Sequence, residues 1–289
     1  MKYNQINIIN KPEIDILNFD LKQYDNFWLL ANQEKILSPK ISLPKPIDLS
    51  VFDSIASTNI KAWELLDRGA KCPVGAIAQQ QTAGKGQWGN QWISSEGGLY
   101  LSVGLDLDLE INNYPHLVIA TVWGIASVLR HYELPVTIKW SNDLILNRRK
   151  LGGIKIETRN TNNKLVQAVV GVGINWCNAV GEPGINLKTF YQNSQAQKIN
   201  SLEELTAITA YGIALGYKYY LAVGVDKILA KYVAIFHNLG QPVTVNNCPG
   251  EVMGVTPKGK LRVKLRSPGA STEVTLSPGQ ISLGYYGFR

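Results

Sequence analysis

The sequence contains few cysteines, and they form no pattern that would join them into a disulfide framework or a zinc site. Cys72, Cys177 and Cys248 are its three cysteines; they lie far apart and form no C-x-x-C motif. An odd number of cysteines cannot all pair with one another, and such usage is typical of a reducing compartment. We therefore expect a cytoplasmic protein without a structural metal centre.

Long hydrophobic segments are also missing from the sequence. The longest uncharged apolar run extends from Leu117 to Leu129, which is 13 residues. A membrane-spanning helix needs about 18 or more apolar residues, so this run predicts a buried helix and no membrane span. The first residues contain no basic region followed by an apolar one, and we expect no export signal.

Basic residues outnumber acidic ones, but they are scattered along the chain. The 29 lysines and arginines and 22 aspartates and glutamates give a net charge of +7. A basic protein can bind nucleic acid, but an acidic protein partner accounts for the same charge. Hydrophobic residues make up 45% of the chain, an ordinary globular composition, and 289 residues suffice for one large domain or two unequal ones.

Residues 1–50 show little periodicity and are interrupted by prolines. A winged-helix DNA-binding domain would need about three helices and a hairpin, whereas the stretch from Pro39 to Pro46 cannot be helical throughout. We therefore predict an N-terminal extension that packs on the rest of the chain, and nucleic acid is not an expected partner. A regulatory DNA-binding domain is the alternative for this segment.

Patterns typical of helices and strands follow one another between residues 51 and 239. Apolar residues at helical spacing predict a helix that follows possible caps at 57–59 and is closed by Gly69, and further helices at 116–131, 201–223 and 226–237. The segment 201–204, Ser-Leu-Glu-Glu, is a capping box that opens the helix at 201–223. Runs of β-branched and apolar residues predict strands at 74–81, 99–105, 136–140, 144–147, 154–157 and 165–171. After residue 240, short runs separated by Pro and Gly predict a small antiparallel barrel or sheet with strands at 242–245, 251–255, 261–265, 273–276 and 280–283.

The segment from Gln81 to Trp92 is rich in glycine and contains two tryptophans. Three glycines within residues 84–89 let backbone amides approach an anion closely, and Lys85 adds a positive charge. A solvated loop rarely carries tryptophan unless the ring covers something, so Trp88 and Trp92 indicate a loop that closes over a ligand. A flexible surface turn is the alternative.

Three further segments place polar or small residues at the ends of expected strands. The segment 139–143, Lys-Trp-Ser-Asn-Asp, supplies a cation, two hydrogen-bonding side chains and a carboxylate. Lys150 stands before Leu and two glycines, within hairpin reach of Asn142. The segment 171–175, Gly-Val-Gly-Ile-Asn, has backbone that can lie flat on a ligand, but it lacks the third glycine of a dinucleotide fingerprint.

Together these segments resemble the motifs of the biotin protein ligase family. The corresponding segments occur in the family's order and at its spacing between residues 52 and 176. The family's S-T-N is matched by residues 57–59, and its loop G-R-G-R-x-G-R-x-W by residues 84–92. Its K-W-P-N-D is matched by residues 139–143, with Ser141 in place of proline, its K-L-G/A-G-I-L-V-E by residues 150–157, and its G-x-G-I-N by residues 171–175.

The resemblance implies a fold, a reaction and a partner. The fold is α+β: a mixed β-sheet flanked by helices at residues 51–239, and a small Src-homology-3-like β-barrel at residues 240–289, preceded by the extension at residues 1–50. The reaction uses ATP and biotin, with Mg²⁺ expected on the ATP. Biotin is activated as biotinyl-AMP and then transferred to a lysine of an acidic biotin carboxyl carrier protein. The protein is expected to be a monomer or a homodimer.

The resemblance also implies roles for individual residues. Those implied in biotin binding are Ser57, Thr58, Asn59, Gln81, Gly84, Lys85, Gly86, Gln87, Lys150 and Gly153. Those implied in nucleotide binding are Gln87, Trp88, Trp92, Lys139, Asn142, Gly171, Gly173 and Asn175, with Trp92 covering the adenine. Lys150 would neutralise the reacting anions, Lys139 would face phosphate, and Asp143 would orient the attacking lysine or a metal ion. The alternatives are a solvated hairpin lysine for Lys150 and helix capping for Ser57 and Thr58.

The glycine-rich loop departs from the family's usual pattern. The family often has arginine where this sequence has Lys85, Gln87, Trp88 and Asn90. Lys85 keeps the positive charge, but glutamine at residue 87 cannot supply the bidentate grip of arginine. We therefore expect the adenylate to be held less tightly, or by other groups.

Three other functions remain open at this point. A lipoate ligase shares the implied fold, but its R-R-x-S-G-G-G loop does not occur in the sequence. A biotin-sensing transcriptional regulator would need a DNA-binding domain. A binding module without activity would require the loss of the adenylation lysine, and Lys150 is present.

Overall fold

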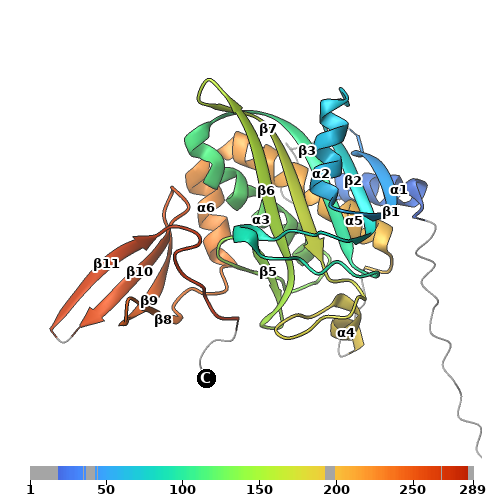
Figure 1. The fold of residues 1–289 in the computed structure, drawn as a ribbon. Coiled ribbons are helices and arrows are strands. Elements are labelled where there is room, and N and C mark those ends of the chain that lie inside the picture. The colour runs from blue at the N-terminus through green and yellow to red at the C-terminus, as the bar shows by residue number, and fades with distance from the viewer. Residues whose placement is uncertain are drawn as a thin grey trace, which may run out of the picture.

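The computed structural model describes residues 19–34, 36, 43, 45–192, 199–267 and 269–285. In these ranges the chain forms a seven-stranded sheet with helices on its faces and a separate four-stranded sheet (Figure 1). The predicted mixed sheet flanked by helices is therefore confirmed. No helix in the described ranges is both long enough and apolar enough to cross a membrane.

The large sheet has the strand order β1-β2-β3-β7-β6-β5-β4, in which β1 and β2 are parallel and the other neighbours are antiparallel. The predicted strands at 99–105, 154–157 and 165–171 prove to be parts of longer strands, because β3 and β6 both pair with β7 beyond these limits, each with one register shift. The strands are β1 (Asp48–Ile55), β2 (Val74–Gln81), β3 (Leu99–Glu110), β4 (Thr137–Lys139), β5 (Asp143–Leu146), β6 (Arg149–Thr161) and β7 (Lys164–Ile174).

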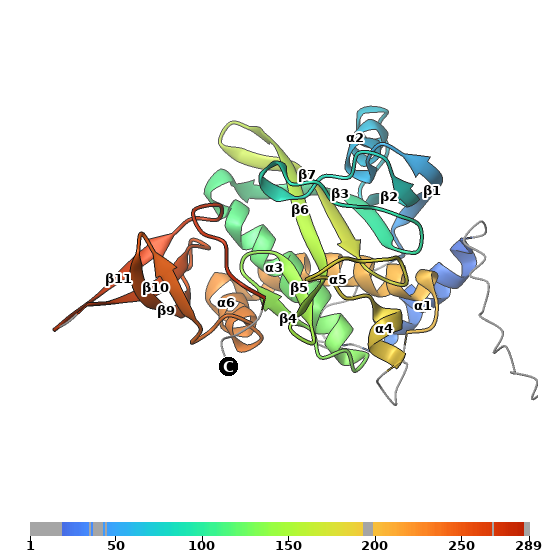
Figure 2. The ribbon, with the colours of Figure 1, turned by 60° about the horizontal axis from the view of Figure 1, so that its bottom comes forward.

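Two long helices, α3 (Tyr114–His131) and α5 (Leu202–Val223), lie side by side across one face of this sheet (Figure 2). The run predicted to be a buried helix is the centre of α3, and its side chains are almost all buried. The two helix backbones touch: a Cβ on Gly124 would lie 2.3 Å from the carbonyl oxygen of Gly212. Glycine is therefore required at this crossing. The predicted cap of α5 is confirmed, since Ser201 Oγ accepts from the amide of Glu204.

Helix α1 (Leu21–Gln33) packs on the outer side of α5. Its buried face includes Trp28, whose ring meets that of Tyr211 edge-on at a centroid distance of 5.4 Å. Residues 1–18 and most of residues 35–44 lie outside the described ranges. The predicted N-terminal extension at residues 1–50 and the other predicted domain limits therefore stay predictions, although β1 begins at Asp48 and already belongs to the large sheet.

Helix α2 (Thr58–Asp67) lies on the opposite face of the sheet. It packs Ala62 and Leu66 against Val74 of β2 and Val169 of β7, which form a core cluster of their own. This contact fixes the start of the helix above the carboxyl end of β7. Gly69, with a φ of +85°, ends the turn after the helix as predicted.

Helix α6 (Val225–Ala234) ends before its predicted limit at His237, because the chain leaves the helix to run beside β4. Ile138 donates its amide to the carbonyl of Ile235 at 2.9 Å and accepts from the amide of His237 at 2.8 Å. These bonds place the start of the C-terminal unit next to the segment 139–143. A further short helix is α4 (Leu187–Gln192).

The C-terminal unit is an antiparallel sheet in the order β11-β10-β9-β8. The strand predicted at 280–283 is wrong, since these residues form no strand. The described residues thus form a small sheet with two open edges, and its closure into a Src-homology-3-like barrel stays a prediction. The strands are β8 (Pro242–Val245), β9 (Cys248–Val255), β10 (Leu261–Ser267) and β11 (Ala270–Leu276).

Candidate functional site

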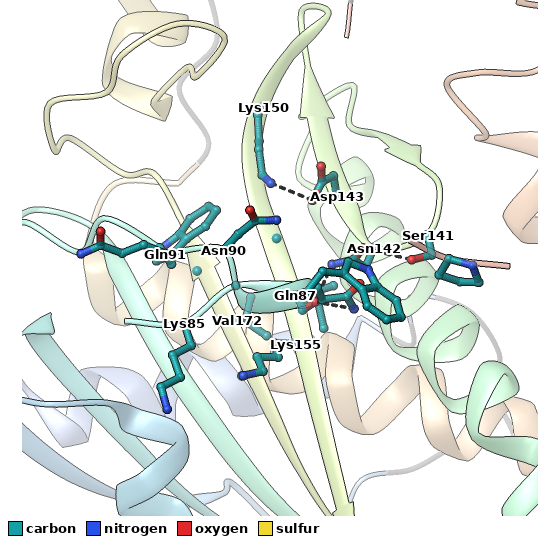
Figure 3. Close-up of a pocket in the computed structure, with 18 of the residues that line it drawn as sticks. Lys85, Gln87, Asn90, Gln91, Ser141, Asn142, Asp143, Lys150, Lys155 and Val172 are labelled. Carbon is teal, nitrogen blue, oxygen red and sulfur yellow. Dashed lines mark hydrogen bonds and ion pairs between the residues drawn. The ribbon is translucent and has the colours of Figure 1, made fainter. Parts of the chain in front are cut away.

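A large pocket opens on the face of the sheet that carries α2 (Figure 3). Its volume is about 620 Å³, and it lies over β6 and β7. Four segments far apart in the sequence form its walls: the start of α2 at 57–60, the loop at 85–92, the turn at 139–143 and the C-terminal segment at 278–285. A pocket of this size can take a small organic ligand and part of a nucleotide.

Glycines form the floor of the pocket. Gly153 of β6 faces Gly173 of β7 in the strand register, and a Cβ on Gly173 would lie 2.4 Å from Trp92 Nε1. A Cβ on Gly171 would lie 2.1 Å from Asn59 Oδ1. Two flat side chains therefore lie directly on the backbone of β7. The approach of a ligand to this backbone stays a prediction.

A polar cluster lies at the start of α2. Gln81 Oε1 accepts from the amide and the hydroxyl of Thr58 at 2.8 and 3.1 Å, and its Nε2 donates to Ser94 Oγ at 2.8 Å. Ser102 Oγ of β3 lies 2.7 Å from Thr58 Oγ1. The cluster brings together donors and acceptors at a buried end of the pocket. Ser57 is buried as well, and its side chain makes no capping bond, so the plain capping alternative does not describe it.

The glycine-rich loop is an irregular hairpin over the floor. Trp92 donates its amide to the carbonyl of Gly84 at 3.0 Å, and a Cβ on Gly84 would lie 2.5 Å from the Trp92 carbonyl oxygen. Gln87 Nε2 donates to the carbonyl of Ile154 only at 3.4 Å, a weak bond. Gly84 supports the hairpin but does not line the pocket. Lys85 is exposed and Gln87 half-buried at the pocket rim.

The two tryptophans of the loop have different surroundings. The indole of Trp92 lies on the glycine floor, and its Nε1 is buried without a hydrogen-bond partner among the described residues. Trp88 is 69% exposed and reaches the C-terminal segment, where a Cβ on Gly279 would lie 3.2 Å from its ring. Lys150 Nζ lies 5.3 Å from the centroid of the Trp92 ring. Thus Trp92 covers the floor, and Trp88 joins the loop to the opposite wall.

Two lysines share one carboxylate at the pocket wall beside Trp92. Lys150 Nζ lies 2.9 Å from Asp143 Oδ1, and Lys139 Nζ lies 3.5 Å from Asp143 Oδ2. Figure 3 shows the Lys150 side chain pointing toward Asp143. Burial lowers the pKa of the Lys139 ammonium; Asp143 opposes this shift and the charge of Lys150 adds to it. We call Lys139, Asp143 and Lys150 the charged cluster; it keeps a net positive charge at the pocket wall.

Tyr285 completes this cluster from the C-terminal segment. Its hydroxyl donates to Asp143 Oδ2 at 2.8 Å, and Lys139 Nζ lies 3.8 Å from the centroid of its ring. Burial, and then the Asp143 carboxylate, raise the pKa of the Tyr285 phenol, which is therefore protonated at neutral pH. Tyr285 could not be predicted from the sequence, because no local pattern connects it with a residue so far away in the chain.

The two predicted asparagines have structural partners. Asn142 Nδ2 donates to the carbonyl of Ile154 at 2.6 Å, which ties the turn to β6 at the pocket. Asn175 does not line the pocket. It is buried, and its Nδ2 donates to the carbonyl of Ile185 at 3.2 Å. Its predicted contact with the nucleotide stays a prediction.

An ion pair inside the pocket was not among the predicted features. Lys155 Nζ lies 3.0 Å from Glu157 Oε1, and both residues are on the pocket face of β6. Burial favours a higher pKa for Glu157, but the bonds from Lys155 and Trp63 outweigh it and hold the pKa below its usual value. A signal was available: at residue 155 the matched motif K-L-G/A-G-I-L-V-E has leucine and this chain has lysine.

Residues 51–175 match the family described as the Biotin/lipoate A/B protein ligase family. The bifunctional ligase/repressor BirA of Bacillus spizizenii is 32% identical over 125 residues, which cover 43% of this chain and 38% of that protein. The chain therefore spans well under half the length of that relative. The biotin--[acetyl-CoA-carboxylase] ligase of Paracoccus denitrificans is 25% identical over 215 residues, which cover 69% of this chain and 85% of that protein.

Solved structures show the same fold. The biotin protein ligase from Aquifex aeolicus in complex with biotin and ATP superposes with a TM-score of 0.61 over 78% of this chain and 95% of that chain. The two sequences are 21% identical, so this likeness establishes the fold alone.

Proposed function

We propose that this chain, which belongs over residues 51–175 to the biotin/lipoate A/B protein ligase family, is an ATP-dependent biotin protein ligase. In the first step the carboxylate of biotin attacks the α-phosphate of ATP, and biotinyl-AMP and pyrophosphate are formed. In the second step a lysine amine of a biotin carboxyl carrier protein attacks the mixed anhydride and releases AMP. The observation that carries the proposal is the charged cluster facing a glycine floor in one pocket.

The charged cluster suits the first step, which brings two anions together. Two unit charges 4 Å apart interact by about 4 kcal/mol at the effective dielectric constant near a protein surface. Fixed cations can offset this repulsion without reorganising during the reaction. Lys150 is 27% exposed and can reach both reacting groups, whereas Lys139 is buried and held in place by Asp143 and Tyr285. Lys150 is thus the group proposed to contact the carboxylate and the α-phosphate.

The floor and the polar cluster divide the pocket between the two substrates. The ureido ring of biotin carries both donors and an acceptor, and the pocket-lining Thr58 and Gln81 offer matching groups. Ser102, which is buried and does not line the pocket, bonds to Thr58 and holds it in place. The nucleotide then lies toward Trp92 and the charged cluster. Trp92 Nε1 is buried and has no hydrogen-bond partner among the described residues, so the indole can shift when the nucleotide binds without breaking such a bond. Closure of the loop over the adenylate would keep water from the anhydride.

Magnesium is proposed to arrive with the nucleotide and not to occupy a site of its own. The pocket-lining carboxylates Asp143 and Glu157 are both paired with lysines. Among the described residues, no group of three His, Cys, Asp or Glu side chains could hold a metal ion. Mg²⁺ commonly keeps several waters and binds through substrate phosphates, so MgATP is the expected substrate.

The partner and the location of the reaction follow from the same proposal. The net charge of +7 and the exposed Lys85 at the pocket rim favour an acidic carrier domain. Three free cysteines among the described residues are consistent with a cytoplasmic enzyme. The C-terminal sheet is proposed to correspond to the family's Src-homology-3-like barrel. A monomer and a homodimer both fit the proposal.

The test is a labelling experiment with two acyl substrates. The protein is incubated with MgATP, a biotin carboxyl carrier domain and labelled biotin, and in parallel with labelled lipoate. We expect biotin-dependent pyrophosphate release and label on one carrier lysine, and little reaction with lipoate. Preferential lipoate transfer would establish the rival ligase of the same fold. Absence of pyrophosphate release with either acid would refute the proposed activity.

A further inference from the structure

The backbone at residues 284 and 285 is hydrogen-bonded to two residues that follow the segment beside β4. Tyr285 and Gly284 offer their carbonyl oxygens to His237 Nε2 at 2.9 Å and to Asn238 Nδ2 at 3.4 Å. His237 also donates its amide to the carbonyl of Ile138, the neighbour of Lys139. The C-terminal segment and the strand that carries Lys139 therefore share one anchor, so the Tyr285 side chain is held in a fixed place over the pocket wall.

From this anchor the phenol makes two different contacts with the charged cluster. Its hydroxyl donates to Asp143 Oδ2 at 2.8 Å, and the face of its ring lies 3.8 Å from Lys139 Nζ. The hydrogen bond is directional, whereas the attraction between ammonium and carboxylate depends mainly on distance. Among the described residues, the Asp143 carboxylate is bonded to the two lysines and to this phenol alone. The phenol therefore fixes which carboxylate oxygen faces which lysine.

We propose that Tyr285 is a positioning residue that acts through Asp143 to keep Lys150 available for the reacting anions. The inference rests on the proposed ligase function. The carboxylate torsion of aspartate is broad, so little else prevents rotation. Without the hydroxyl, Asp143 can turn both oxygens toward Lys150, since Lys139 is the more distant of its two lysine partners. Lys150 would then be more fully neutralised and would stabilise the transition state less.

The Tyr285 ring has an effect of its own, and two substitutions distinguish it from the effect of the hydroxyl. It covers the ammonium of Lys139 and keeps this buried cation in a low-dielectric environment. Tyr285→Phe removes the hydrogen bond and keeps the ring. Tyr285→Leu removes both. Tyr114→Phe is the matched control, because its phenol donates to the carbonyl of Ile156 at 3.0 Å and does not line the pocket.

The experiment measures single-turnover formation of biotinyl-AMP with enzyme in excess. For Tyr285→Phe we expect a rate constant about tenfold lower, because one hydrogen bond to a charged group is lost. The amplitude of the reaction and the KM for biotin should be unchanged. Tyr285→Leu should be slower still, and Tyr114→Phe should match the parent. A purely structural role would lower the amplitude or the melting temperature and leave the rate constant of the remaining active enzyme unchanged.

A double-mutant cycle then tests whether Tyr285 acts through Asp143. In an Asp143→Ala background, Tyr285→Phe should cause no further loss. A further tenfold loss in that background, or a parent-like rate for Tyr285→Phe alone, would overturn the inference and leave the ligase function standing. A parent protein that forms no biotinyl-AMP would instead refute the proposed function, and the inference with it.

Discussion

Replacement of Gly173 by alanine tests the close contact between the pocket floor and Trp92. The added Cβ would lie 2.4, 2.5 and 2.8 Å from three atoms of the indole. Optimal contact between carbon atoms is about 3.5–4.0 Å, so the indole must move by about 1 Å or more. Such overpacking typically costs about 1–3 kcal/mol. We expect Gly173→Ala to lower the free energy of unfolding by this amount and to displace Trp92 from the floor.

The displacement should also weaken nucleotide binding, since Trp92 is proposed to cover the adenine. Each 1.4 kcal/mol corresponds to about a factor of ten in affinity, so a loss of about tenfold is expected for ATP in titration calorimetry. Gly181→Ala is the matched control, because a Cβ there meets no atom within 4 Å and Gly181 is not among the glycines with positive φ.

A second background makes the interpretation specific. In a Trp92→Ala protein the ring that collides with the new methyl group is gone, so Gly173→Ala should no longer destabilise the fold. The reasoning would be refuted if Gly173→Ala kept the stability and the ATP affinity of the parent. It would also be refuted if the two substitutions destabilised the protein additively.

Three further predictions concern the charged cluster and the loop. Lys150→Ala should slow biotin-dependent pyrophosphate release by about 10²–10³ without unfolding the protein. The control Lys164→Ala breaks a surface ion pair with Asp108 and should leave this release unchanged. A folded Lys150→Ala variant with normal release would contradict the assignment. Biotin and ATP together should lower hydrogen exchange at residues 84–92 and leave the β6–β7 turn at 162–163 unchanged; equal exchange with and without ligands means that the loop does not close. In a pulse-chase, Gln87→Arg should slow the release of biotinyl-AMP. Gln87→Gly should change this release little, because the contact of Gln87 with β6 is weak. A hundredfold faster release from the glycine variant would show that glutamine already holds the adenylate.

The residues of the charged cluster could be predicted because they lie close together in the sequence. Lys139 and Asp143 stand at the two ends of one turn, and Lys150 is on the next strand of the same hairpin. Adjacent antiparallel strands bring such residues together whatever the rest of the fold does. The glycine floor follows for the same reason, since Gly153 and Gly173 are paired in the register of neighbouring strands.

Other parts of the pocket depend on contacts that no local pattern encodes. Residues 280–283 alternate in polarity as a strand does, but alternation indicates extended backbone and not a pairing partner. In the folded chain this segment lines the pocket instead. Lys155 could have been noticed from its place in the matched motif, but its pairing with Glu157 depends on which face of β6 is turned to the pocket.

The bond between Asp143 and Tyr285 joins residues 142 positions apart in the chain. During synthesis, the turn that carries Asp143 is complete long before the segment that carries Tyr285 leaves the ribosome. A nascent chain can therefore form the hairpin of β5 and β6 while one wall of the pocket is still missing. Closing so long a loop is also slow relative to local contacts. After denaturation, recovery of activity should accordingly lag behind recovery of the helical circular dichroism signal. The delay measures how long the C-terminal segment takes to pack against the rest of the pocket.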